Sequence, residues 1–308
     1  MARSTMAPLV AAVDGSEGSL RALDWAVDEA RLRGRRLRVV HAFTWLTSGV
    51  PAEVVQRYDL ATMARRIAEE ARAHALARAP ELDVEAAWPE GDPGDVLLEE
   101  AERAALVVVG SRGASRLGAV FLGSVGLQLA ALAPCPLVVV PHLEPRPATG
   151  RVVAGLDGSA PARAAAEWAF DEAARRRATL HAVAVYGTAS HGVFVSLETP
   201  PPGPGSPEER AAEEEARREL SESLAGLRAR RPEVRAESAV IAGHPAHVLT
   251  TRSRTADLVV VGSRGRGGFA GMLLGSVSQT LLTHAACPVA VLHADASEDD
   301  RALGGAGG

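Results

Sequence analysis

The chain of 308 residues is written twice, and this internal repeat constrains the fold more than any other feature. The segment LVAAVDGS at residues 9–16 returns as VVAGLDGS at residues 152–159. The segment LVVVGSRG at residues 106–113 returns unchanged at residues 258–265. A repeat unit of about 145 residues is the size of a whole domain, so the sequence predicts two similar domains in tandem.

The second copy is nine residues longer than the first. Matching positions are 143 residues apart at Asp14 and Asp157 but 152 residues apart at Gly110 and Gly262. The Pro-rich stretch 199–207 is the natural place for the insertion, because such a segment cannot join a packed core. We therefore expect the first domain at residues 1–148, with a linker at its end over 145–150, the second domain at 149–293, and a disordered tail at 294–308.

Each copy alternates apolar strand patterns with helix patterns. Apolar strands without alternation, separated by helices, indicate a parallel sheet that is covered on both faces. Right-handed crossovers then favour a doubly wound, Rossmann-like α/β fold in each copy, with ligands at the carboxyl ends of the strands. In the first copy we expect strands at 9–13, 37–43, 84–88, 106–109 and 137–140, and helices at 19–33, 52–79, 93–104 and 124–133.

A glycine-rich loop follows the fourth expected strand of each copy. Its pattern is G-x-x-G at residues 110–113, then nine residues, then Gly-Ser at 123–124, and the second copy repeats it at 262–265 and 275–276. Glycine permits a close approach of ligand to main chain, and the start of a helix offers free N–H groups with the positive end of the dipole behind them. The repeated spacing therefore predicts a phosphate-binding loop in each copy.

The composition excludes several other kinds of phosphate chemistry. All 33 basic residues are Arg, so the chain can build neither a Walker A lysine loop, nor a protein-kinase lysine, nor a Schiff base. A net charge of -5 gives no case for nucleic acid or anionic membrane as the main partner. No apolar run approaches the ~20 residues of a membrane span, and two Cys form no disulfide framework. We expect a cytoplasmic protein.

At these residues the chain resembles the universal stress protein family in its tandem two-domain form. Both copies carry G-x-x-G, nine residues and G-[ST], an early strand that ends in Asp, and a Cys-Pro before the last strand. The resemblance covers nearly the whole chain. It implies a doubly wound sheet related to the adenine nucleotide α-hydrolase folds and, in the branch of the family that keeps these glycines, ATP binding.

The resemblance also implies which residues hold the nucleotide. Asp14 would meet the sugar hydroxyls or the adenine edge, and the main chain of Ala42 would read adenine. The implied contacts of the first copy are Val13, Asp14, Ala42, Gly110, Arg112, Gly113, Gly123, Ser124 and Val125. Those of the second copy are Leu156, Asp157, Val185, Gly262, Arg264, Gly265, Gly275, Ser276 and Val277. The implied ligand is ATP or a related adenine nucleotide, with Mg²⁺ as an optional companion.

Two of these assignments have structural alternatives. Asp-Gly-Ser after a strand is also good turn and helix-capping chemistry, which would by itself account for Asp14 and Asp157. An arginine in a loop is commonly solvated, so Arg112 and Arg264 add charge to the site only if they turn inward.

Four other residues attract attention and are expected to be structural. Cys135 and Cys287 lie before the last strands with no activating base in their own segments, and we interpret them as small buried residues. His244 and His247 have a spacing that could reach one metal ion. Their counterparts in the first copy are Asp92 and Asp95, and each of these two pairs lies beside a Pro. We therefore interpret the two histidines and the two aspartates as polar residues at helix starts.

The last strands predict association of the two copies. Residues 137–140 and 289–292 are apolar throughout, and an apolar terminal strand invites edge pairing. In the resembled family that strand joins two domains, so we expect an intramolecular pseudo-dimer, with a homodimer of chains as a further step.

The functional hypothesis is an ATP-binding regulatory protein of the stress response. The sequence shows no catalytic constellation, so it predicts no enzyme beyond slow ATP hydrolysis. The alternative is a scaffold or interaction module of the same fold whose loops hold no nucleotide. A pyrophosphate-releasing ligase is disfavoured, because residues 14–17 read Asp-Gly-Ser-Glu where such enzymes carry Ser-Gly-Gly.

Overall fold

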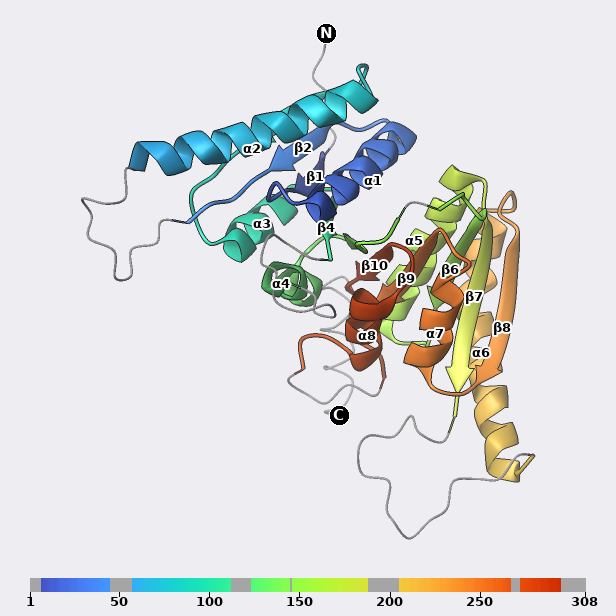
Figure 1. Ribbon diagram of the computed structural model, residues 1–308. Coiled ribbons are helices and arrows are strands. Elements are labelled where there is room, and N and C mark those ends of the chain that lie inside the picture. Colours follow the sequence, from blue (N-terminus) through green and yellow to red (C-terminus); the bar gives the residue numbers. More distant parts are fainter. Residues whose placement is uncertain are drawn as a thin grey trace, which may run out of the picture. The chain divides into compact units, whose positions relative to one another are not determined.

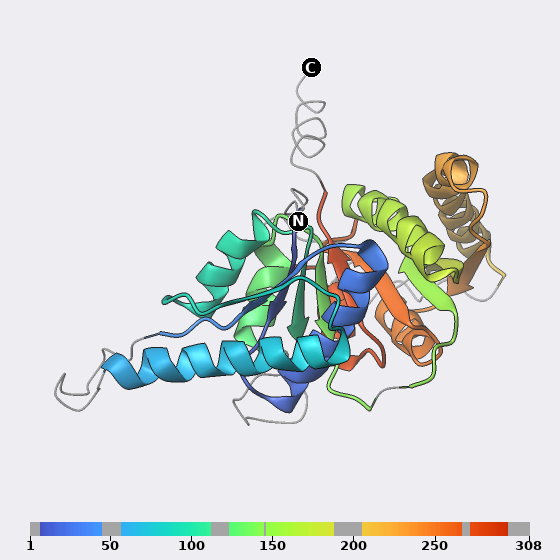
Figure 2. The ribbon, with the colours of Figure 1, turned by 90° about the horizontal axis from the view of Figure 1, so that it is seen from above.

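The computed structural model describes residues 7–44, 57–111, 123–144, 146–187, 205–266 and 272–294. The chain divides into two compact units, the first unit at residues 1–142 and the second unit at residues 143–308. Each unit contains one five-stranded parallel sheet (Figures 1 and 2). The tandem α/β architecture predicted from the repeat is confirmed.

The first unit has the strand order β3-β2-β1-β4-β5, and all four pairings between neighbours are parallel. Its central strands β1 and β4 and its strand β5 are continuous apolar segments, such as LVVV in β5, in which all four residues are buried, whereas β2 and β3 each carry one charged residue. The elements are β1 (Leu9–Ala12), α1 (Glu17–Arg33), β2 (Leu37–Val40), α2 (Arg57–Arg78), β3 (Val84–Ala87), α3 (Pro93–Ala101), β4 (Leu106–Gly110), α4 (Ser124–Leu132) and β5 (Leu137–Val140).

The second unit repeats this topology with the order β8-β7-β6-β9-β10, again parallel throughout. Its two outer strands on the β8 side are longer than their counterparts, with eight residues in β7 and seven in β8. The elements are β6 (Arg151–Gly155), α5 (Ala160–Arg176), β7 (Thr179–Tyr186), α6 (Pro207–Arg230), β8 (Ala236–Ala242), α7 (Pro245–Ser253), β9 (Leu258–Gly262), α8 (Ser276–His284) and β10 (Val289–Leu292).

Helices cover both faces of each sheet. In the first unit α1 packs with α2 and α3 packs with α4, and in the second unit the corresponding pairs are α5 with α6 and α7 with α8. Burial on both faces explains why β1, β4, β6 and β9 are apolar without alternation.

The chain reverses its direction of winding between the first and fourth strands of each unit. It runs outward from β1 through β2 to β3, returns through α3, and places β4 on the other side of β1. The helices on either side of such a switch point leave the strands in opposite directions, so a crevice opens at the carboxyl ends of these two strands. The equivalent place in the second unit lies at the ends of β6 and β9.

Several boundaries differ from the sequence expectation. Helix α1 begins at Glu17 rather than near Ser19, because the Ser16 hydroxyl caps it by accepting the Ser19 N–H. Strand β2 ends at Val40, and Phe43 forms only an isolated bridge with Glu90. Most of the Pro-rich stretch 199–207 and all but one residue of the tail 294–308 lie outside the described residues.

Helices α1 and α5 end in the same left-handed turn on different residues. Gly34 ends α1 at φ 60°, whereas the equivalent turn of α5 is made by Arg177 at φ 51°. In both turns N–H groups of the cap return to the last carbonyls of the helix. A side chain in this region costs about 1–2 kcal/mol, a strain that glycine avoids. The backbone of Arg177 is therefore strained, whereas the first unit avoids this strain because a glycine occupies the equivalent position.

A buried glutamate also recurs in the first helix of each unit. Glu29 is 2% exposed and accepts from Arg33, and Glu172 is fully buried, accepts from Arg175 at 2.6 Å and forms an ion pair with Arg176. A buried carboxylate is tolerated only when it is paired, so these contacts make each helix dependent on its own arginines.

We predict that Arg177→Gly raises the free energy of unfolding by about 1 kcal/mol, because it removes the left-handed strain. Gly34→Ala should lower it by a similar amount. A Cβ at Gly34 would meet no atom of the described residues within 4 Å, so the cost there is conformational. Urea denaturation measures both changes, and a loss of stability in Arg177→Gly would contradict the assignment.

We predict that Glu172→Ala destabilises the second unit by about 2 kcal/mol, because two arginines lose a buried partner while keeping partial contact with solvent. The matched control is Glu167→Ala on the same helix, which removes an exposed pair with Arg230 and should stay within about 1 kcal/mol of the parent. Equal effects of the two variants on urea denaturation would show that the buried pair carries no special stability.

Candidate nucleotide site

Asp157 joins the end of β6 to the loop after β9. Its Oδ1 accepts the Ser159 N–H at 3.1 Å and the Ser159 hydroxyl at 2.6 Å. Its Oδ2 accepts the main-chain N–H of Arg266 at 3.0 Å. The first two bonds are the turn chemistry offered as an alternative for Asp-Gly-Ser, although the residue that caps α5 is Ser159 itself. The third bond ties the glycine-rich loop to the switch point.

Gly265 stands against the same carboxylate. A Cβ placed on it would lie 2.4 Å from Asp157 Oδ2, so only glycine permits this approach without a shift. Gly262 has a different reason: its Cβ would lie 2.7–2.9 Å from Pro161 and the Ala162 nitrogen, in the first turn of α5. The two glycines of this G-x-x-G therefore serve close packing, one of loop on carboxylate and the other of strand on helix.

The start of α8 lies beside this loop. Gly275 caps the helix without a side-chain hydrogen bond, and its own N–H donates to Ser263 O at 2.8 Å. Ser276 is exposed, and it opens the helix together with Val277. The first N–H groups of a helix have no intrahelical acceptor, so this end can receive an anion. Loop, carboxylate and helix start meet at the ends of β6 and β9.

The main chain of Val185 is aimed at the same place. Residues along a parallel strand direct their N–H and C=O groups to its two neighbours in turn. Val183 O accepts from Leu156, on the β6 side, whereas Tyr186 O accepts from Gly243, on the β8 side. The main-chain N–H and C=O groups of Val185 therefore point to the β6 side, beyond the hydrogen bond that joins Val183 O to the Leu156 N–H. The side chain of Leu156 is buried in the core, so its main chain alone can meet a ligand.

The first unit shows the same arrangement around Asp14. Its Oδ1 accepts the Ser16 N–H at 3.0 Å and the Ser16 hydroxyl at 2.5 Å. His41 contacts Val13 O through Nδ1 at 2.8 Å. Val40 O accepts the Val13 N–H, so by the same alternation the main chain of Ala42 faces the β1 side. Both adenine-side residues predicted from the resemblance thus point their peptide groups toward the switch point.

The phosphate side of the first unit is described only in part. Gly110 is the last residue of β4, and the N–H of Gly123 donates to Ser111 O at 3.3 Å before Ser124 and Val125 open α4. This contact matches that of Gly275 with Ser263 in the second unit. The predicted contacts Arg112 and Gly113 lie outside the described residues. In the second unit Arg264 is exposed.

The second site holds an ion pair that the sequence did not predict. Arg266, directly after the G-x-x-G, pairs with Glu219 of α6. A Cβ on Gly158 would lie 2.9 Å from the Arg266 guanidinium and 3.4 Å from a Glu219 oxygen, so the pair covers the turn beside Asp157. The matching residues of the first copy are Ala114 and Ile67, so the repeat showed that both positions differ between the copies but not that the two residues touch.

The cysteines and histidines lie apart from these loops. Burial raises the pKa of Cys135 to about 11 and that of Cys287 to about 12, so both thiols stay protonated at neutral pH. Asp92 caps α3 by accepting from Gly94, and His244 holds the equivalent position of α7. Among the described residues, no group of three or more His, Cys, Asp or Glu side chains could hold a metal ion.

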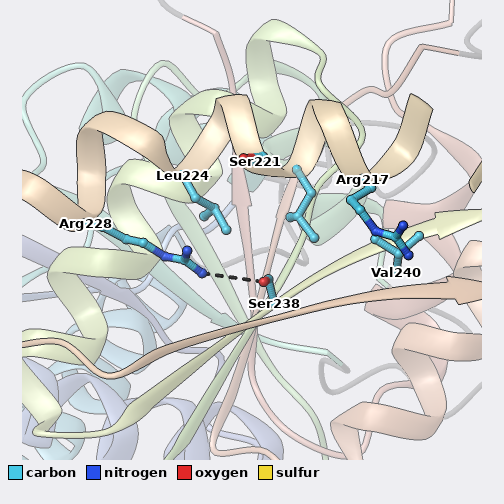
Figure 3. A pocket seen from close by; sticks show the side chains of 7 residues that line it. Arg217, Ser221, Leu224, Arg228, Ser238 and Val240 are labelled. Carbon is cyan, nitrogen blue, oxygen red and sulfur yellow. Dashed lines mark hydrogen bonds between the residues drawn. The ribbon is translucent and has the colours of Figure 1, made fainter. Parts of the chain in front are cut away.

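A groove of about 320 Å³ lies between α6 and β8 (Figure 3). Arg217 at one end is paired with Glu213 and Glu214, and Arg228 at the other reaches the Ser238 hydroxyl at 3.5 Å. The groove is lined by Arg217, Leu220, Ser221, Leu224, Arg228, Ser238 and Val240. None of these is a predicted nucleotide contact, so the groove is separate from the candidate site.

Among the described helices, none combines the length and the apolar character that crossing a bilayer requires. The sequence model of the universal stress protein family matches residues 6–141 and 149–293. A universal stress protein of Mycobacterium tuberculosis strain H37Rv is 35% identical over 312 residues, which cover 94% of this chain and 96% of the relative. Another, from Mycolicibacterium smegmatis, is 35% identical over 292 residues, covering 92% and 96%.

Among solved structures, a universal stress protein of Archaeoglobus fulgidus matches with a TM-score of 0.67 and 20% identity, over 94% of this chain and 97% of that one. This likeness concerns the fold. The two family matches fall on the two copies of the repeat, and the relatives align along nearly their whole length. The chain belongs to the universal stress protein family.

Proposed function

We propose that each unit binds an adenine nucleotide at its switch point and that occupancy regulates the protein. The observation that carries this proposal is the contact of Asp157 with the Arg266 N–H, which brings the predicted sugar-side residue and the predicted phosphate loop to one place. The start of α8 lies on the same loop through Gly275. Residues more than a hundred positions apart in sequence thus form one candidate site.

The phosphates would be held without lysine. The loop supplies main-chain N–H groups, the start of α8 supplies further N–H groups and the positive end of its dipole, and the exposed Ser276 supplies a hydroxyl. Ser124 offers the same group at the start of α4. These donors suit the phosphates of ATP or a related adenine nucleotide, with Mg²⁺ able to join them through the phosphate oxygens.

The adenosine would lie on the other side of the loop. The peptide groups of Val185 and Ala42 face past the ends of β6 and β1, where they can pair with the edge of adenine. The carboxylates of Asp157 and Asp14 follow the first strand of each unit, and Asp157 also accepts the Arg266 N–H of the phosphate loop, so we assign both carboxylates to the sugar. Each already accepts bonds from its own turn, so a ribose hydroxyl would join or replace one of them.

The role that fits this site is binding rather than catalysis. Its donors are main-chain groups and hydroxyls, which hold a polyphosphate but neither activate a water molecule nor accept a proton at neutral pH. We therefore propose a nucleotide-responsive regulator of the stress response with at most slow ATP hydrolysis. A scaffold of the same fold that holds no nucleotide is the alternative.

Native mass spectrometry of the freshly purified full chain, together with calorimetric titration by ATP, tests the proposal. We expect added mass of one or two adenine nucleotides per chain, or heat on addition of ATP, ADP or AMP. Absence of bound mass together with absence of heat from all three would favour the scaffold.

We predict that Gly275→Val and Gly123→Val each weaken nucleotide binding in their own unit only, because a branched side chain at the helix start occupies the space of a phosphate. The change at Gly275 should also affect stability. A Cβ at Gly275 would lie 3.3 Å from Ser263 O and 3.4 Å from the Arg264 Cα, so a branched side chain there forces a shift of the loop.

Gly275→Val should therefore also lower the melting temperature of the ligand-free protein. Calorimetric titration and thermal melts measure the two effects. Unchanged affinity in the double variant would refute the assignment of both loops.

A further inference from the structure

The second site carries a charged pair that the first site lacks. Arg266 donates its main-chain N–H to Asp157 and sends its guanidinium to Glu219 on α6. The pair lies over Gly158, where a Cβ would come within 2.9 Å of the guanidinium. A ligand held by Asp157 would therefore lie next to Arg266.

In the first unit an apolar side chain covers the equivalent turn. Ile67 of α2 is the counterpart of Glu219, and a Cβ on Gly15 would lie 3.6 Å from its side chain. The residue that corresponds to Arg266 is Ala114, which lies outside the described residues. The two units can therefore be compared directly, because the turn after the first strand is covered by an isoleucine in the first unit and by an ion pair in the second.

The two partners of the pair are not equally exposed. The Arg266 side chain is 53% exposed, whereas that of Glu219 is only 12% exposed. The Glu219 carboxylate thus lies next to the site with little water to screen it, and it offsets the charge of an arginine that solvent can reach. Without Glu219 the arginine would present a full positive charge to a bound anion.

We propose that Arg266 is a specificity-determining residue of the second site, which senses the negative charge of the ligand, and that Glu219 weakens its attraction for phosphate. This inference rests on the proposed nucleotide binding. The two sites of one chain are consequently unequal: the second responds to the number of phosphates through Arg266, and the first has no counterpart of this pair.

The experiment is a double-variant cycle at the second site, read by calorimetric titration with ATP, AMP and adenosine at low salt. The full chain carries Asp14→Ala, so that binding reports mainly the second unit. Glu219→Gln should tighten ATP binding by about two- to fivefold, the size of one partly exposed ion pair. The gain should be smaller for AMP and absent for adenosine, and it should shrink at higher salt.

The remaining variants complete the cycle. Arg266→Ala leaves the Glu219 carboxylate facing the ligand and should weaken ATP binding by about two- to fivefold. The double variant, Glu219→Gln with Arg266→Ala, should return the affinity for ATP to near the parent value. Glu213→Gln, which removes an exposed pair with Arg217 on the same helix, is the matched control and should change nothing.

A second background separates the possible failures. With Asp157→Ala in place of Asp14→Ala, Glu219→Gln should leave the remaining affinity unchanged, because that affinity reports the first unit. An effect of equal size on ATP and adenosine, or ATP binding that is insensitive to both Glu219→Gln and Arg266→Ala, would overturn the inference. Failure of the unmodified chain to bind any adenine nucleotide would instead overturn the proposed function.

Discussion

The candidate sites depend on the parallel pairing of strands that are buried on both faces. Parallel strands bring all their carboxyl ends to one edge, and the reversal of winding after β3 and β8 opens that edge between the first and fourth strands of each unit. Loops that are far apart in the sequence meet at that edge. Asp157 and Arg266 are joined in this way across 109 positions.

The absence of lysine shapes how such a site can hold phosphate. Apart from the arginines of the loop, the donors described at the ends of β6 and β9 are main-chain N–H groups, hydroxyls and a helix start, all of which depend on geometry. This dependence explains the glycines. Gly265 is pressed against Asp157, and Gly262 against the first turn of α5, so the loop keeps its shape by close packing.

The repeat also shows where two copies of one design have diverged. Their sheets, their turns after the first strand and their buried helix glutamates agree, because each of these features is required for the fold. The copies differ where the fold tolerates a change: Gly34 against Arg177 at a helix end, and Ile67 against Glu219 above the turn. The first difference affects stability alone, whereas the second lies beside the candidate site.

Much of this could be read from the sequence. The repeat, the continuous apolar strands and the spacing of the glycines predicted two doubly wound units with loops at the same edge, because such patterns depend on local preferences and on burial. Helix ends were less certain, since α1 begins at a cap that involves Ser16 rather than at Ser19.

The sequence alone could not show which partners meet through space. It favoured a ligand role for Asp157 without excluding the turn role, and the structure adds a bond from Asp157 to the loop that no local pattern contains. It also gave no reason to connect Glu219 with Arg266, because charged residues on a helix commonly face solvent. Only the packing of α6 beside the loop decided that contact, since tertiary structure alone sets the distance between side chains that are 47 residues apart.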